Sequence, residues 1–237
     1  MVSFQGLVRR NIVNMNVQNE RLGAISDNFA NFNTNAYKGV DFKQFVTEDG
    51  YVDGVGTSDH SLGALMKTEQ KLDIGLATPG YIPVTSESGD VVYTRDGSLR
   101  VNKDGYLITF DNFLVGDGIK IPHNYYDITI KPDGAVQVIR EAGNKPETVG
   151  YIPVVNFPDP QGLKQLDGNK YLATRKSGDP YLSQNHEGIR QGMLERSNVD
   201  MYKSSYDAMR IMASQTASLR FVQAVNKIYD EAINLQQ

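Results

Sequence analysis

The first 42 residues carry an apolar repeat of seven residues that strongly limits what they can fold into. One position of the repeat holds Met1, Val8, Met15, Leu22 and Phe29, and a second position holds Phe4 and Ile25. Such a repeat describes a helix that lies along a narrow seam against another helix. The spacing therefore predicts one helix from about Val2 to Phe29 and a helical partner for it.

We expect this helix to be marginal without that partner. Asn is a poor helix former, and eight Asn residues lie between positions 11 and 35. Asn11 and Gln18 also interrupt the second position of the repeat. Polar residues in such a seam favour a unique register at a cost in stability. Isolated helices are barely stable in water, so this one should depend on packing against another element.

The end of the chain contains a second helical pattern. The segment Ser197 to Asp200 offers N-cap residues, and neither Gly nor Pro follows it. We therefore predict a helix from Met201 to about Leu235. Its apolar residues again recur at a spacing close to seven; they are Met201, Ala208, Ile211, Met212, Leu219, Val222, Val225, Tyr229 and Ile233.

The two seams indicate that the terminal helices pair with each other, with neighbouring copies, or both. The alternative is that each helix packs on the core of its own domain, as amphipathic helices usually do. A seam two positions wide favours pairing, because a core-facing helix carries a broader stripe. The residues predicted to form the assembly seams are Phe4, Val8, Met15, Leu22, Ile25, Phe29, Met212, Leu219, Val222, Val225, Tyr229 and Ile233.

Between the helices the apolar period falls to about two, which is typical of β-strands. Asp96-Gly97 and Asp104-Gly105 lie at tight-turn spacing, and residues 131–134 join two further short strands. This middle part predicts a mostly antiparallel β domain of the meander or sandwich type. Residues 48–63 are rich in Gly and Asp and read as an irregular connector.

The predicted fold class is thus α+β, with long N- and C-terminal helices forming a coiled-coil stem and a central, mostly antiparallel β domain. We place the N-terminal helix and the segment after it at 1–42. A connector follows at 43–63, the β domain at 64–196 and the C-terminal helix at 197–237.

Composition excludes several classes of protein. The net charge is −4 and Lys and Arg are not clustered, which argues against a nucleic-acid surface. Cysteine is absent, so neither disulfides nor thiolate metal sites can form. No apolar run is long enough to span a membrane as a helix. Polar residues follow Ile12 and Val13 at once, so export would not use an ordinary cleaved signal peptide.

No motif for catalysis or metal binding is present. The three histidines (His60, His123 and His186) are not spaced as metal ligands. Asp59-His60-Ser61 has the residue types of a catalytic triad, but neighbours in sequence do not provide its geometry. Three glycines (Gly50, Gly54 and Gly56) lack the Gly-Lys-Ser/Thr of a phosphate loop. We therefore expect no enzyme, cofactor, metal site or small-molecule substrate.

Five segments resemble motifs of the bacterial flagellar basal-body rod and hook proteins. Residues 28–39 (NFANFNTNAYKG) resemble the N-L-A-N-x-N-T-x-G-[FY]-K signature near the start of that family. Residues 72–84 (LDIGLATPGYIPV), 93–107 (which contains YTRDGSL and KDGYL) and 154–163 (VVNFPDPQGL) are similar to its internal motifs. Residues 191–200 (QGMLERSNVD) resemble the motif that opens its C-terminal helix. The motifs occur in the family's order along the whole chain.

The resemblance, to the FlgF/FlgG type, implies a structural rod subunit without enzymatic activity. Such subunits leave the cell through the flagellar type III export apparatus and stack as a helical homo-oligomer in the axial drive shaft that crosses the periplasm. Other rod and hook proteins would be its neighbours, and the terminal helices would form the inner tube. The alternative left open by the residues alone is a secreted or periplasmic β-rich enzyme or carbohydrate-binding module, because paired carboxylates need no local signature.

The signature residues implied by the resemblance are Asn28, Ala30, Asn31, Asn33, Thr34, Tyr37, Lys38, Ser197, Asn198, Val199 and Asp200. Inside the signature, Asn35-Ala36 stands where the family has Gly, and Asn is the non-Gly residue that tolerates left-handed backbone best. The segment from Lys43 to Leu65 is short for the insertion usual in distal-rod proteins. That length favours a member resembling the proximal rod.

Overall fold

The computed structural model describes residues 4–167, 169–183 and 187–234. The chain divides into two compact units. Unit 1 contains the residues up to 32, residues 39–59 and the residues from 199 onward, whereas unit 2 contains residues 33–38 and 60–198. Both terminal helices therefore belong to unit 1.

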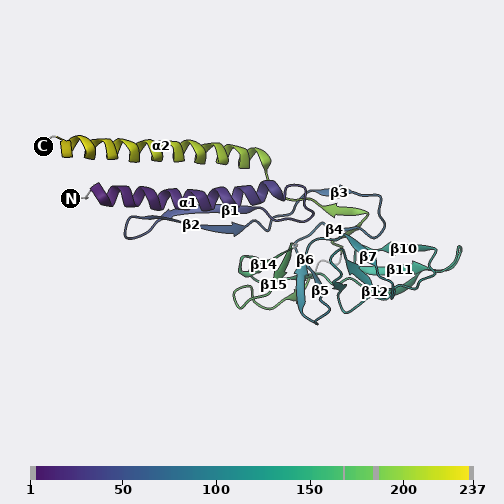
Figure 1. Ribbon diagram of the computed structural model, residues 1–237. Coiled ribbons are helices and arrows are strands. Elements are labelled where there is room, and N and C mark those ends of the chain that lie inside the picture. Colours follow the sequence, from purple (N-terminus) through teal and green to yellow (C-terminus); the bar gives the residue numbers. More distant parts are fainter. Residues whose placement is uncertain (1–3, 168, 184–186, 235–237) are drawn as a thin grey trace. The chain divides into compact units, whose positions relative to one another are not determined.

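Unit 1 consists of two long helices and one hairpin (Figure 1). Helix α1 (Phe4–Ala30) and helix α2 (Met201–Asn234) pack side by side in antiparallel directions. Strands β1 (Val40–Val46) and β2 (Val52–Ser58) pair antiparallel and pack along α1. The pairing of the terminal helices confirms the predicted helical stem.

The hairpin occupies a segment that the sequence describes as partly irregular. Glycines disfavour a strand because they add no side chain to pack, which is why we expected a connector there. In the structure the Phe42 ring of β1 lies over Gly54 of β2, where a Cβ atom would overlap the ring. Val17 of α1 lies next to the same place. The glycine therefore makes room for an aromatic ring that packs against the helix.

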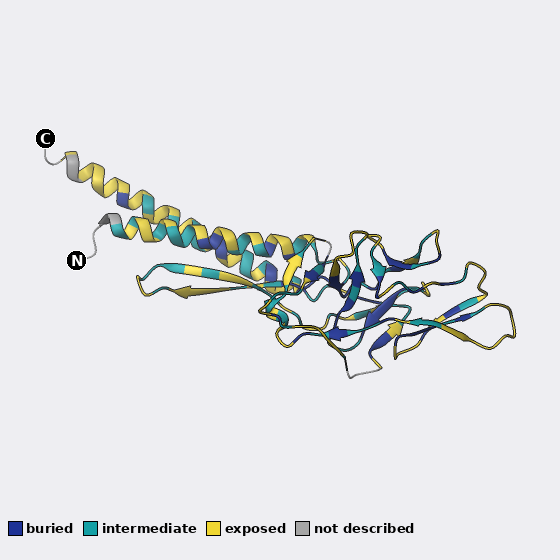
Figure 2. Ribbon diagram, turned by 90° about the horizontal axis from the view of Figure 1, so that it is seen from below, coloured by how far each residue is buried: buried dark blue, intermediate teal, exposed yellow. Residues whose placement is uncertain are grey.

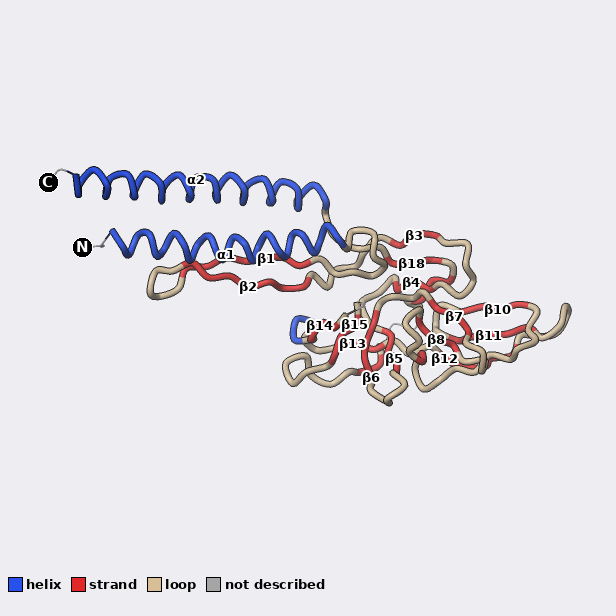
Figure 3. The backbone as a smooth tube through the Cα atoms, viewed as in Figure 1, coloured by secondary structure: helices blue, strands red, loops and turns tan. Residues whose placement is uncertain are grey.

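Unit 2 contains the remaining strands, with one short 3₁₀ helix, η1 (Pro160–Gly162), between them (Figure 3). The strands are β3 (Leu65–Lys67), β4 (Ile74–Leu76), β5 (Ile82–Thr85), β6 (Val91–Thr94), β7 (Leu99–Val101), β8 (Leu107–Thr109), β9 (Leu114–Val115), β10 (Asp127–Ile130), β11 (Ala135–Ile139), β12 (Glu147–Tyr151), β13 (Val155–Asn156), β14 (Lys164–Leu166), β15 (Lys170–Leu172), β16 (Tyr181–Leu182), β17 (Ile189–Gln191) and β18 (Met193–Glu195).

Every strand pairing in unit 2 is antiparallel, as predicted. The largest sheet has the order β14-β15-β6-β5-β9-β8-β7, and β10, β11 and β12 form a second sheet. Three two-stranded sheets pair β13 with β16, β17 with β4 and β18 with β3. The predicted turns at Gly105 and Gly134 have positive φ (86° and 87°). Gly97 instead allows close approach of two backbone segments, because a Cβ there would overlap the carbonyl group of Ile74.

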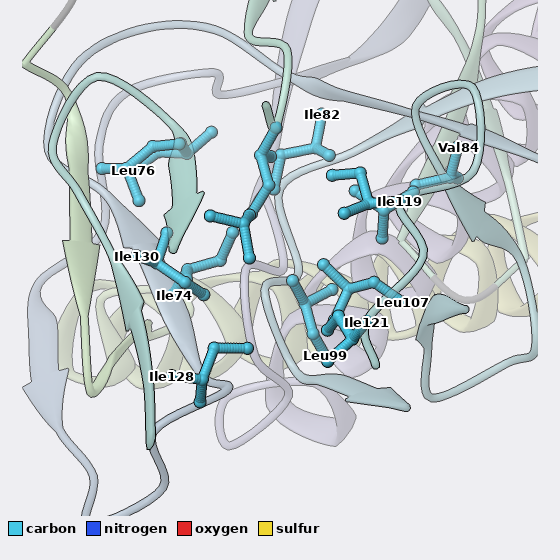
Figure 4. Packing of buried hydrophobic residues seen from close by; sticks show 14 of the residues in the cluster. Ile74, Leu76, Ile82, Val84, Leu99, Leu107, Ile119, Ile121, Ile128 and Ile130 are labelled. Atoms are coloured by element: carbon cyan, nitrogen blue, oxygen red, sulfur yellow. The ribbon is translucent and has the colours of Figure 1, made fainter. Parts of the chain in front are cut away.

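The main core of unit 2 is aliphatic and joins several of its sheets (Figure 4). Ile74, Leu107 and Val136 are fully buried within it. A second cluster is aromatic and contains Tyr81, Tyr93, Val155, Phe157 and Tyr171. Coloured by burial, the strands of unit 2 include many dark blue segments, whereas the helices of unit 1 are mostly yellow and teal (Figure 2). The core of this protein is thus carried by its β domain.

Burial in the aromatic cluster disfavours ionised phenol groups. It raises the pKa of Tyr81 to about 12 and raises that of Tyr171 as well. The Tyr81 hydroxyl bonds Nδ1 of His60 at 2.8 Å. The Tyr171 hydroxyl is buried and has no hydrogen-bond partner among the described residues.

We expect Tyr171→Phe to raise the free energy of unfolding by about 1–2 kcal/mol, because it removes a buried polar atom without a partner. Tyr81→Phe is the matched control, and it should lower that free energy by about 1 kcal/mol because it deletes a formed hydrogen bond. Chemical denaturation of the full chain measures both. Equal losses in the two variants would show that the Tyr171 hydroxyl is solvated.

Candidate assembly surface and signature segments

The seam between α1 and α2 is partly polar. Gln18 donates from Nε2 to Ser214 Oγ at 2.9 Å, and Asn11 donates from Nδ2 to the Ser218 carbonyl at 3.0 Å. The amide oxygen of Gln18, Oε1, is buried without a hydrogen-bond partner among the described residues. A seam of this kind specifies register more than it adds stability. Both residues that interrupt the apolar repeat therefore face the partner helix.

The predicted seam residues are divided between the seam and the surface. Ile25 and Val225 are buried, and Val8, Met15, Leu22, Phe29 and Val222 are half-buried. Met212, Leu219 and Tyr229 remain 55%, 52% and 43% exposed. The side chains of Phe4 and Ile233 lie outside the described part of the helices. The role of all the predicted seam residues in assembly stays a prediction.

The face of α2 that packs on α1 differs from its most apolar stripe. Its covered positions repeat every seven residues as Ser204, Ile211, Ser218 and Val225, with Ala208, Gln215 and Val222 between them. Several of these residues are small or polar, and Gln215 donates to Asn19 at 2.7 Å. Hydrophobicity alone therefore selects some residues that the helix pair leaves uncovered.

Unit 1 contains few buried apolar side chains. Within the described residues they are Val17, Ile25, Val199, Ile211 and Val225, and all other members of the apolar core belong to unit 2. The same unit exposes many large apolar side chains on its helices and hairpin. Unit 1 is thus built like an interface rather than like a self-contained domain.

The first residue of the N-terminal signature, Asn28, joins the end of α1 to the start of β1. Asn28 is buried, and its side chain accepts from the Val40 amide at 2.8 Å and donates to the Val40 carbonyl at 2.9 Å. One amide group thus satisfies both backbone groups of a strand residue, as a neighbouring strand would. Asn31 donates to the Asp27 carbonyl at 2.9 Å, and Ala30 is the last, exposed residue of the helix.

The C-terminal signature caps α2. Asp200 accepts from the amides of Tyr202 and Lys203 at 2.9 and 3.0 Å, which is the geometry of an N-cap. This confirms the predicted start of the helix. Lys203 also forms an ion pair with Asp41 of β1 at 2.7 Å. That hydrogen bond raises the pKa of Lys203 above its usual value.

Three of the family motifs meet in unit 2 at a buried ion cluster formed by Lys38, Arg95 and Glu195. Lys38 Nζ lies 2.7 Å from one carboxylate oxygen of Glu195, and Arg95 lies 2.7 Å from the other. The side chains of all three are at most 2% exposed. Arg95 also donates to the carbonyls of Leu76, Thr78 and Gly80. Buried charges are tolerated only with such complete pairing.

The ion cluster gathers the segments of unit 2 at which the chain enters and leaves it. The Gly63 amide donates to Glu195 at 2.8 Å, and the Ala36 amide donates to the Glu195 carbonyl at 2.8 Å. Asn198 donates through its backbone to Tyr37 and through its side chain to Ser61. Residues 36–38, 61–63 and 195–198 are therefore held in one place.

The remaining signature residues lie in or next to these segments in the sequence. Tyr37 and Val199 are buried, and Ser197 is half-buried. The Asn33 side chain accepts a hydrogen bond from Arg196 at 3.4 Å. The Thr34 carbonyl accepts a hydrogen bond from the Tyr37 amide at 3.4 Å. Sequence reasoning included Lys38 among the site residues but left out Arg95 and Glu195. Both stand inside motifs already noted, but each has a charged neighbour, Asp96 and Arg196, so the local sequence does not single them out.

Left-handed backbone in the signature falls on Ala36, not on Asn35. Ala36 has φ of 56°, and this conformation is costly for a residue with a Cβ. Ala36 is also fully buried, and the Asn35 side chain instead donates to Ser98 Oγ at 3.3 Å. The hydrogen bond from Ala36 to Glu195 holds the backbone in place, so the surrounding structure imposes the strain.

The structure also bears on metal binding and on membrane insertion. Within residues 4–167, 169–183 and 187–234, no three His, Asp or Glu side chains are grouped as a metal site would require. His186 lies outside these residues. Over the same ranges no helix combines the length and apolar character needed to cross a bilayer.

Comparisons with known proteins agree with the motifs. Residues 76–138 match the family model of the flagellar hook protein FlgE/F/G D1 domain. The flagellar basal-body rod protein FlgG of Agrobacterium fabrum is 31% identical over 224 residues, which are 81% of this chain and 85% of that protein. FlgG of Caulobacter vibrioides is 39% identical over 137 residues, 56% of this chain and about half (52%) of its own length.

A third relative is the flagellar basal-body rod protein FlgF of Buchnera aphidicola, which is 24% identical over 203 residues, 79% of this chain and 80% of that protein. The Agrobacterium match extends over most of both proteins. The chain therefore belongs to the family of flagellar basal-body rod proteins FlgG and FlgF, a structural and non-enzymatic family whose members assemble in the flagellar rod.

Proposed function

We propose that this subunit polymerises with further copies of itself through its terminal helices and thereby forms part of the axial drive shaft for motility. The observation that carries the proposal is the construction of unit 1. Its helices pair through a partly polar seam, and large apolar side chains such as Met212 and Leu219 remain exposed. Soluble single-chain proteins rarely leave apolar patches of this kind uncovered.

Folding and assembly would be coupled in this account. A partly polar seam offsets little of the conformational entropy lost when two long helices become ordered. Apolar contacts with neighbouring copies would supply the missing stabilisation at the growing end. The helices would then be fully ordered only within the polymer, which suits a subunit that has to pass through a narrow export channel.

We also propose the partners of this subunit. They are other copies in a helical assembly, other flagellar rod and hook proteins as axial neighbours, and the flagellar type III export apparatus as the route outward. The rod would span the periplasm. A position resembling that of the proximal rod stays a prediction from the length of the segment between Lys43 and Leu65.

The test replaces the gene with variants and isolates basal bodies. The wild-type chain should restore motility and copurify with basal bodies, whereas Met212→Glu/Leu219→Glu should abolish both. Tyr126→Glu, at a 70% exposed residue of unit 2, is the matched control and should retain both. Full motility of the helix variant would refute assembly through the terminal helices.

A further inference from the structure

Helix α2 carries large apolar side chains on two opposite faces. One face packs on α1 through residues such as Ile211 and Val225, which are buried. The opposite face carries Tyr202, Tyr206, Met209, Phe221 and Ile228, which follow one another at helical spacing and are 91%, 62%, 66%, 43% and 55% exposed. We call these five residues the outer stripe. A helix that is apolar on both sides is normally covered on both.

Two small residues lie in the middle of the outer stripe. Ala213 and Ala217 are exposed and fall between Met209 and Phe221 on the same face. Small side chains at this point let another backbone approach α2 closely, while the large residues on either side provide contact area. The outer stripe thus combines small and large side chains in the way that helix-packing surfaces do.

Helix α1 contains a glycine that the single subunit does not explain. Gly23 lies in the interior of α1, where glycine costs about 1 kcal/mol relative to alanine. A Cβ added there would meet nothing within 4 Å. Asn16 and Ala30, seven residues before and after it, are exposed on the same side. We call this face of α1 the small-residue face; it is suited to close approach by a helix from outside the subunit.

The charges beside the two faces are mainly opposite. Arg210 and Arg220 lie on the same face of α2 as the outer stripe, and both are exposed. Glu20 and Asp27 lie beside the small-residue face of α1 and are exposed as well; the exposed Arg9 lies on that side too, nearer the start of the helix. Contact between two outer stripes would bring the arginines together, which is unfavourable. Contact between unlike faces of two copies brings opposite charges together instead.

We propose that the outer stripe of α2 in one copy docks on the small-residue face of α1 in a second copy. This inference rests on the proposed function and names one pair of faces through which two copies would contact each other, separate from the exposed Met212 and Leu219. The contact joins two different surfaces, so it is heterologous, and repeating it produces an open helical polymer unless the rotation closes a ring. A symmetric dimer through α2 alone is the arrangement it excludes.

Crosslinking tests the contact directly, because the natural chain has no cysteine. The full chain carrying Asn16→Cys and Ala217→Cys is produced as the only copy in cells, and isolated basal bodies are treated with a short bismaleimide. A heterologous contact should give a ladder of dimers, trimers and larger species under denaturing conditions. The matched control, Asn16→Cys with Gln223→Cys, uses an exposed residue on another side of α2 and should lose that ladder.

The outcomes separate the inference from the proposed function. If the wild-type chain is absent from basal bodies, the proposed function fails. If the chain is present but the ladder is missing, or is equally strong in the Gln223→Cys control, the proposed contact is wrong. Crosslinked dimers formed by Ala217→Cys alone would show a symmetric α2 contact and would also overturn it.

Charge exchange provides a second, independent readout. Arg210→Glu/Arg220→Glu should reduce the amount of chain in basal bodies at least about tenfold, because like charges then meet across the contact. Adding Glu20→Arg/Asp27→Arg to the same chain should restore most of it. A fourfold variant that is no better than the twofold variant would contradict this pairing of faces.

Discussion

Replacing Glu195 with Gln should lower the free energy of unfolding of unit 2 by about 3–5 kcal/mol, since it leaves Lys38 buried without its carboxylate partner. Glu195 is the only acidic member of the ion cluster, and both its oxygens are bound to cations. Bulk water does not reach the two side chains, because Lys38 and Glu195 are both 0% exposed. Hydrogen exchange of core amides in β8 and β11 of the full chain measures this loss.

The matched control is Glu147→Gln. Glu147 pairs with Arg140 at 3.0 Å, but the two side chains are 55% and 58% exposed, so its loss should cost less than about 1 kcal/mol. A cost for Glu195→Gln as small as that for Glu147→Gln would mean that the cluster reorganises or admits water. In that case it could not hold the entry and exit segments of unit 2 as described.

The second large effect concerns the helices of the dilute, unassembled subunit. We expect the amides of α1 and α2 to exchange through openings that cost no more than about 2 kcal/mol. Core amides of unit 2 should require several kcal/mol more, in the range of global unfolding. The reason is that unit 1 buries few apolar side chains for helices of 27 and 34 residues. Hydrogen exchange read by peptide mass at several protein concentrations measures both units in one sample.

Assembly provides the internal control for this prediction. Raising the concentration towards polymerisation should protect α1 and α2 strongly and change the core of unit 2 little. Protection of the helices equal to that of the β core at the highest dilution would show that the single subunit is self-sufficient. The coupling of folding to assembly would then be refuted, although the membership of the family would stand.

The ion cluster and the helix pair have different physical roles. Unit 2 has an aliphatic core and a hydrogen-bonded cluster of buried charges, which hold its connecting segments in one arrangement. Unit 1 has a partly polar seam and uncovered apolar residues, which suit contacts completed by other copies. The rigid core and the exposed apolar side chains thus belong to separate parts of one chain.

Local patterns in the sequence determined much of this description. The period of seven predicted both helices and the polar residues Asn11 and Gln18 in the seam, and the capping residues at 197–200 predicted the start of the second helix. The period of two, with turns at Gly105 and Gly134, predicted antiparallel β structure. These features depend on residues a few positions apart, and local backbone preferences are sufficient to specify them.

Tertiary structure alone decided what depends on residues far apart in the chain. Lys38 and Glu195 are separated by 157 positions, and no local pattern shows that their charges meet. Strand β2 likewise forms by pairing with β1, whose Phe42 ring covers Gly54. Helix α2 turns a partly polar face to α1 and leaves its outer stripe exposed. Periodicity shows that a helix has an apolar side, but only the packed structure shows which side is already covered, because covering requires a partner from elsewhere in space.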